Sequence, residues 1–247
     1  MPARTDKTTD PVLRAQLLLA RRGQAIFSRA LNELRGDELD APSLMPGWTR
    51  RHVAAHVGLN ARALTHLTEW AATGIETPMY ASPTEREEEI EFAATLPARA
   101  LRNLSAHAAV HLDVEWRDLE PAAWDAHVRT ALGRLVPARE TVWMRTREVW
   151  VHAVDLDHGA SFRQFPPELV DALLADVVGS WRRRGGTVAL ALEPVDRPVG
   201  ATVTVGGAAP IRLRGRAADL AQWATGRGGQ GVTRPDGSPP PTPPRWL

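Results

Sequence analysis

Residues 147–153 read Arg147-Glu148-Val149-Trp150-Val151-His152-Ala153, a short run that mixes bulky apolar side chains with two metal-binding types. On an α-helix, residues four apart lie on one face with Cβ atoms about 6 Å apart, so Glu148 and His152 could hold one divalent cation. Val149 and Trp150 predict that the helix is buried, and a buried carboxylate needs a partner because desolvating an unpaired charge is costly. The run therefore predicts a buried helix that carries half of a metal site.

A second pair with the same spacing, His52 and His56, lies about a hundred residues upstream. One imidazole from that helix would complete a set of three protein ligands, which leaves a coordination position open, as in catalytic metal sites. Spacing alone does not decide which histidine binds. We favour His56, because it lies one turn deeper in its helix and nearer the apolar side. We expect surface or structural roles for the remaining histidines, namely His66, His107, His111, His127 and His158.

Helical periodicity dominates the first two thirds of the chain. The long helices are expected from about 13 to 34, from Thr49 as N-cap to Ala72, from Pro97 to about 119, and from Pro137 in the first turn to Leu156, with a shorter acidic helix from Thr84. Four long helices joined by loops of varied length predict a four-helix bundle, and bundle cores commonly hold metals.

The sequence pattern changes after about Gly159. A helix at 166–184, short β-like runs at 187–192, 201–205 and 211–214, and a helix at 216–225 predict a small α/β domain. Residues 239–244 are rich in proline and predict an extended tail, with Trp246 and Leu247 holding its end. The chain is therefore expected to be an α+β protein with a bundle domain at 1–160 and an α/β domain at 161–247.

Composition excludes several functional classes. The formal net charge of the 247 residues is +1, which gives no electrostatic reason to expect a nucleic acid or membrane partner. No apolar run is long enough for a transmembrane helix, and the N-terminus lacks the apolar core of a signal peptide, so we expect a cytoplasmic protein. The chain has no cysteine, so any sulfur chemistry needs a thiol from outside.

Two arginines stand out by their surroundings. Arg86 lies in the acidic run Glu85–Glu89, and Arg227 lies in the loop Gly226–Gly229. A surface salt bridge and a loop residue would explain them. They could instead bind the two carboxylates of a dicarboxylate substrate, because a guanidinium pairs with a carboxylate through two parallel hydrogen bonds.

Several of these segments together resemble the mycothiol-dependent maleylpyruvate isomerase family, within the wider DinB-like metal-binding superfamily. The resemblance is carried by 47–50 leading into His56, by 143–156, and by the segments 76–80, 100–104 and 244–247. It implies a DinB-like four-helix bundle followed by a sterol-carrier-like α/β domain. It also implies that His56, Glu148 and His152 bind a divalent metal, most often zinc, and that Arg86 and Arg227 are functional. No residue that contacts mycothiol can be assigned from the motif.

The family's reaction converts maleylpyruvate to fumarylpyruvate in gentisate degradation, with mycothiol and a divalent metal as cofactors. A metal-activated thiolate adds to the double bond, the resulting single bond rotates, and the thiolate leaves. We expect Arg86 and Arg227 to bind substrate carboxylates and stabilise the developing enolate. Because Arg227 belongs to the C-terminal domain, we expect the active site to fall between the two domains.

The residues leave three alternatives open. A mycothiol S-transferase would use the same activated thiol but leave it attached to an electrophile. A metal-dependent hydrolase would use the open position for hydroxide and need no thiol. A non-catalytic metal-binding bundle would bind metal without turnover.

Overall fold

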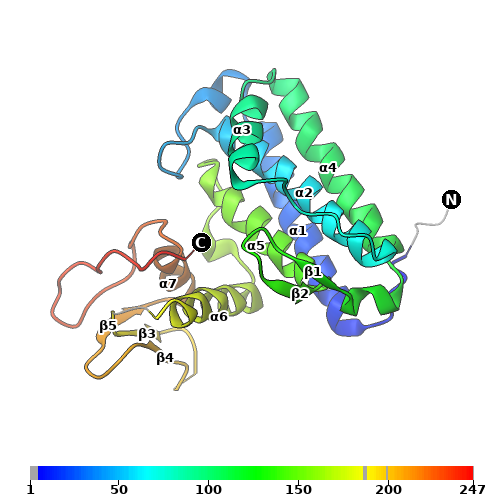
Figure 1. Cartoon of the computed structure of the whole chain (residues 1–247). Coiled ribbons are helices and arrows are strands. Elements are labelled where there is room, and N and C mark those ends of the chain that lie inside the picture. The colour runs from blue at the N-terminus through cyan, green and yellow to red at the C-terminus, as the bar shows by residue number, and fades with distance from the viewer. Residues whose placement is uncertain (1–4, 186–187, 199, 247) are drawn as a thin grey trace. The chain divides into compact units, whose positions relative to one another are not determined.

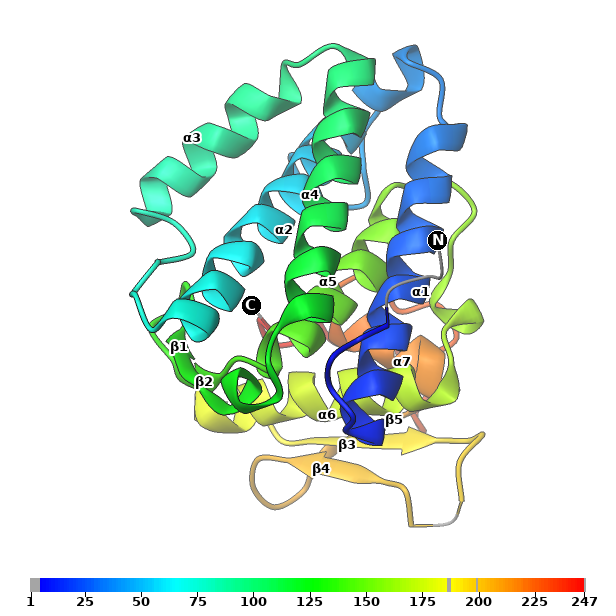
Figure 2. The same cartoon turned by 90° about the vertical axis from the view of Figure 1, so that its right-hand side faces the viewer.

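Four long helices pack side by side in the N-terminal part of the chain (Figure 2). They are α1 (Pro11–Glu33), α2 (Arg50–Thr73), α4 (Ala98–Asp118) and α5 (Glu140–Asp155). The computed structural model describes residues 5–185, 188–198 and 200–246, and the chain divides into two units, Met1–Ala160 and Ser161–Leu247. Helix α2 packs against α4 and α5, and α1 packs against α5. The predicted four-helix bundle is confirmed, as is the α+β class (Figure 1).

The start of α2 is fixed by a reciprocal cap. Thr49 is the N-cap, as predicted, and its hydroxyl accepts the backbone N–H of His52. In return, His52 Nδ1 accepts the backbone N–H of Thr49 at 3.2 Å. These two bonds satisfy amide groups that the first helical turn otherwise leaves unpaired. At the other end, Gly74 adopts a left-handed conformation with φ of 74°, which ends the helix.

A close approach of α1 to α5 depends on a glycine. A Cβ atom on Gly23 would lie 2.7 Å from Val149 Cγ2 and closer still to the Trp150 ring. The Trp150 indole N–H donates to the Leu19 carbonyl of α1 at 3.0 Å. The absence of a side chain at Gly23 thus lets α1 lie directly on the part of α5 that carries the predicted metal-binding pair.

The remaining helical segments of this unit are shorter. They are α3 (Pro83–Ala94), which packs on α2, and the 3-10 helices η1 (Asp37–Asp40) and η2 (Pro121–Asp125). The Ser82 hydroxyl accepts the Glu85 N–H at 3.0 Å and so caps α3. The expected acidic helix is therefore present.

One prediction for this unit is wrong. Pro137 does not open the fourth helix but ends strand β2 (Leu135–Pro137), which pairs antiparallel with β1 (His127–Arg129). Helix α5 begins later, at Glu140. The hairpin forms because Val128 and Val136 lie opposite each other and are both buried.

The C-terminal unit combines helices with a small mixed sheet (Figure 1). Its elements are η3 (Phe162–Gln164), α6 (Pro167–Arg183), β3 (Leu190–Pro194), β4 (Val203–Val205), β5 (Ile211–Gly215) and α7 (Ala217–Ala224). The strand order is β4-β3-β5, with β4 antiparallel and β5 parallel to the central strand. The expected helices and strands are found here with small shifts at their ends; residue 187 lies outside the described residues.

The proline-rich tail lies along this unit and is held by hydrogen bonds from its helices. The Trp181 and Trp223 indole N–H groups donate to the carbonyls of Pro244 at 2.9 Å and Pro241 at 2.7 Å. The Ser180 hydroxyl donates to the Trp246 carbonyl at 2.9 Å. Trp246 is buried, as predicted, whereas Leu247 lies outside the described residues.

Across the described residues, no helix has the length and apolar character needed to span a membrane.

Candidate metal centre

Helices α2 and α5 bring His56, Glu148 and His152 together inside the bundle. Glu148 Oε2 lies 3.0 Å from His56 Nε2 and 3.1 Å from His152 Nε2. One ligand atom from each residue lies within 4.8 Å of the other two. Both histidines are buried, and the Glu148 side chain is 13% exposed. These are the three side chains that the sequence predicted as ligands.

A fourth buried group orients one of the imidazoles. Asp155 Oδ2 lies 2.8 Å from His152 Nδ1, one turn further along α5. Because an ionised carboxylate only accepts hydrogen bonds, Nδ1 carries a proton, and Nε2 is the nitrogen that faces Glu148. This carboxylate–histidine arrangement is typical of metal-binding histidines. Asp155 is not among the predicted site residues, although its spacing of three residues from His152 places both on one helix face.

The charges of the three residues are strongly coupled. Burial on its own would raise the pKa of Glu148, but hydrogen bonds from His152 and His56 hold the pKa of this carboxyl well below its usual range. Burial opposes protonation of His152, yet its bonds to Asp155 and Glu148 raise its pKa to about 9. Burial lowers the pKa of His56. In the metal-free protein, His152 therefore carries a second ring proton, on the Nε2 that faces the ionised Glu148.

Helix α3 brings the predicted Arg86 to the same place. Arg86 Nη2 lies 3.2 Å from His56 Nδ1, and its guanidinium lies over the Tyr80 ring, 5.7 Å from the ring centre. The Trp48 ring lies 5.5 Å from that of His56. Tyr80 and Trp48 lie in the segments 76–80 and 47–50 that carry the family resemblance, but neither is among the predicted site residues. In the structure, Trp48 lies beside the His56 imidazole and Tyr80 lies beside the Arg86 guanidinium.

Arg227 lies in the C-terminal unit, just after α7. Its guanidinium Nη1 donates to the Thr225 carbonyl at 2.6 Å, and its own carbonyl accepts from Gln222 Nε2 at 2.9 Å. These two hydrogen bonds hold the loop that contains Arg227 against the end of α7. The functional role of Arg227 stays a prediction.

The donor set fits a divalent cation. Two imidazole nitrogens and one carboxylate oxygen are the ligand types of catalytic zinc sites, which keep a further position open. Asp155 supplies the outer hydrogen bond that such a site needs. His111 and Glu115 on α4 have the same spacing but lack these features, because the His111 side chain is exposed, Glu115 is half-buried, and Nε2 lies 3.6 Å from Oε1.

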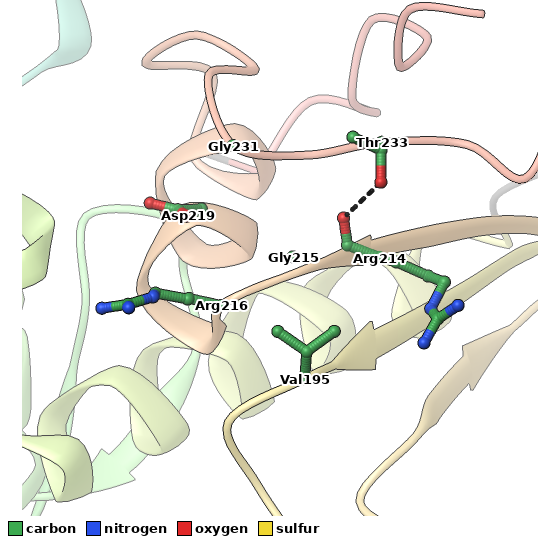
Figure 3. Close-up of a pocket in the computed structure, with 7 residues that line it drawn as sticks. All are labelled: Val195, Arg214, Gly215, Arg216, Asp219, Gly231 and Thr233. Atoms are coloured by element: carbon green, nitrogen blue, oxygen red, sulfur yellow. Dashed lines mark hydrogen bonds between the residues drawn. The ribbon is translucent and has the colours of Figure 1, made fainter. Parts of the chain in front are cut away.

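The C-terminal unit contains a separate hollow of about 370 Å³ (Figure 3). Two arginines line it, but the side chains of Arg214 and Arg216 point to opposite sides and do not converge on one anion (Figure 3). Asp219 is held by Arg163 at 2.8 Å. None of the five predicted site residues lines this hollow; its lining residues are Val195, Arg214, Gly215, Arg216, Asp219, Gly231 and Thr233.

Comparison with known proteins gives three matches in agreement. Residues 20–157 match the family model of the mycothiol maleylpyruvate isomerase N-terminal domain. A crystal structure of the mycothiol-dependent maleylpyruvate isomerase is similar over 95% of this chain and 97% of that chain, with 44% identity and a TM-score of 0.90. The structure of a histidine-to-alanine mutant of such an enzyme gives the same values. No curated protein matches the chain significantly.

Proposed function

The chain belongs to the mycothiol-dependent maleylpyruvate isomerase family, and we propose that it converts maleylpyruvate to fumarylpyruvate in gentisate degradation, using mycothiol and a zinc ion. The observation that supports this most directly is the convergence of His56, Glu148 and His152 within 4.8 Å in a buried part of the bundle. These three residues would hold the cation, and Asp155 would orient His152 toward it.

The absence of cysteine supports an external thiol as the nucleophile. A free thiol with a pKa near 8.5 is only a few per cent thiolate at neutral pH. When bound, the cation and mycothiol would together supply a sulfur anion that adds reversibly to the double bond, so that the bond can rotate. The bundle's contribution is to fix three ligands and leave one position for that sulfur.

Arg86 is suited to bind a carboxylate of the substrate. It lies against the proposed ligand His56 and stacks over Tyr80, so its guanidinium is held at the edge of the metal centre. A guanidinium placed there would also stabilise negative charge that develops on the substrate during the reaction. We propose the same kind of role for Arg227.

The decisive experiment follows the ultraviolet absorption of maleylpyruvate with and without mycothiol, together with the metal content of each protein. We expect thiol-dependent loss of substrate in the wild type. His56→Ala should lose most of the bound metal and at least about a hundredfold in turnover, because one of three ligands is gone.

His111→Ala is the matched control. His111 also pairs with a glutamate four residues away, but it is exposed on α4, so this variant should keep metal and activity. Turnover without thiol would point to a metal-dependent hydrolase, and a stable thiol conjugate would point to an S-transferase. Full activity in His56→Ala would contradict the proposal.

A further inference from the structure

Arg145 is a buried arginine that the proposed reaction does not yet use. It lies one turn before Glu148 on α5 and is 2% exposed. Its guanidinium donates to the Val57 carbonyl at 2.7 Å, to Asn60 Oδ1 at 3.0 Å and to Gln24 Oε1 at 2.7 Å. All three acceptors are neutral, and Arg145 forms no salt bridge with any residue that the structure describes.

Burying a charge without a counter-ion lowers the stability of the fold, so the presence of Arg145 calls for a functional explanation. Burying an ion costs several kcal/mol even after relaxation, and an apolar side chain of similar volume is often the more stable choice. Burial lowers the pKa of Arg145 to about 10, which still leaves it charged at neutral pH. The nearby Glu148 carboxylate favours the charged form. The positive charge of Arg145 therefore acts on the Glu148 carboxylate of the metal centre, while three neutral oxygens hold the guanidinium in place.

We infer that Arg145 is a fixed positive charge of the metal centre, which does not ligate the metal but favours the anionic form of a thiol bound there. This inference rests on the proposed function. A divalent cation, the Glu148 and Asp155 carboxylates and one thiolate sum to a charge of −1. Arg86 at His56 and the buried Arg145 bring this sum to +1, so the thiol releases its proton to solvent at a lower pH than it would if residue 145 were neutral.

The bonds to α1 and α2 explain how the charge stays in place. Val57 follows His56 directly, and Asn60 lies one turn beyond it, so Arg145 holds the part of α2 that presents the proposed ligand. Gln24 contributes from α1. A cation anchored on three sides cannot move out to water when the centre gains or loses charge, which is the condition for a preorganised electrostatic effect.

The test measures the protonation of a bound thiol and does not depend on turnover. Protein loaded with Co²⁺ is titrated with 2-mercaptoethanol, and the thiolate-to-cobalt charge-transfer band is followed against pH. Arg145→Met removes the charge and should raise the midpoint of this titration by about one pH unit. Arg145→Lys keeps the charge and should leave the midpoint close to that of the wild type.

Gln24→Met is the matched structural control. It removes one of the three hydrogen bonds but keeps the guanidinium, so it should lower the melting temperature without moving the midpoint. If Arg145→Met does not fold, Arg145→Gln replaces it as a neutral variant that can still bond to Asn60.

The outcomes separate this inference from the proposed function. A folded, cobalt-loaded neutral variant with an unchanged midpoint would overturn the role of Arg145 alone. A midpoint in Gln24→Met that rises as much as in Arg145→Met would also overturn it, since loosened packing would then explain both. A wild-type protein that binds no Co²⁺, or shows no thiolate band, would overturn the proposed function and this inference with it.

Discussion

His52 and His56 lie four residues apart on the same helix and have different tasks. His52 Nδ1 accepts the Thr49 amide and closes the cap of α2, while its Nε2 lies 3.3 Å from the exposed Glu91. His56 is buried one turn deeper and faces Glu148. The difference follows from position in the helix, because only the first turn has unpaired amide groups to satisfy. His52 thus supports the helix that presents the proposed ligand.

The protonation of His152 predicts how metal binding depends on pH. The pKa of His152 is raised to about 9 in the metal-free protein, so at neutral pH Nε2 carries a second ring proton that must leave before the metal binds. The apparent affinity for Co²⁺ or Zn²⁺ should therefore rise about tenfold per pH unit from about pH 7 and level off near pH 9. Competition with a chromogenic chelator at several pH values measures this.

Asp155→Asn tests whether the hydrogen bond to Asp155 is what raises the pKa of His152. Without the carboxylate, the pKa of His152 should fall, so the affinity should level off at a lower pH. The affinity on that plateau should also be about 10–100-fold weaker, as is usual when the outer partner of a metal-binding histidine is removed. An affinity for the wild type that is flat between about pH 7 and pH 9 would contradict the assignment of the proton to His152.

The proposed ligands could be predicted from spacing and burial, but their surroundings could not. Glu148 and His152 share a helix face, so their proximity is a local property of the chain. The contact between Arg86 and His56 depends on how α3 packs on α2, and spacing carries no information about that. For Arg86, the family resemblance rather than the acidic run indicated a functional role.

At the level of helices and strands, the long helices were predictable because their apolar stripes and caps are encoded locally. The hairpin of β1 and β2 was not. Its strands have three residues each, too few to show an alternating pattern, and they are stabilised by the pairing of Val128 with Val136 and by contact with α2. Pro137 suits a first helical turn and also the end of an edge strand, and tertiary packing decides between them.

The contact between α1 and α5 predicts that Gly23→Ala is destabilising. The new Cβ would clash with Val149 and Trp150 across the helix interface, which typically costs about 1–3 kcal/mol of the free energy of unfolding. Because Glu148 adjoins this contact, metal affinity should fall as well. Urea unfolding of the metal-free protein and a metal titration test both effects.

Gly58→Ala is the comparison for this prediction. Its Cβ would meet Leu104 and Ser105 of α4 at 3.2 Å or more, a milder overlap than at Gly23. Both glycines lie in helix interiors, where alanine is favoured over glycine by about 1 kcal/mol, so the two variants differ in the overlap of the new Cβ. Gly23→Ala should therefore be clearly the more destabilising of the two, and an equal or reversed order would show that α1 and α5 can separate at little cost.

On the scale of the whole molecule, the residues with proposed roles in the reaction are divided between the two units. The three proposed ligands, Asp155 and Arg86 lie in the bundle, whereas Arg227 follows α7 in the C-terminal unit. The resemblance implied this division, and no local pattern around Arg227 would have suggested it. The glycines that flank Arg227 predict a loop but give no indication of a functional role for the arginine. Its contribution can therefore be separated experimentally from metal binding.

Arg227→Ala should leave metal binding unchanged and reduce the reaction. If Arg227 binds a substrate carboxylate, its loss removes a charge-assisted hydrogen bond of about 1.5–3 kcal/mol, so kcat/KM for maleylpyruvate should fall about 10–150-fold. Arg212→Ala is the control, because Arg212 is an exposed arginine of the same unit that pairs with Glu193. Steady-state kinetics and metal content are measured for both variants. An unchanged kcat/KM in Arg227→Ala would mean that substrate recognition resides in the bundle, with Arg86 as its remaining carboxylate-binding residue.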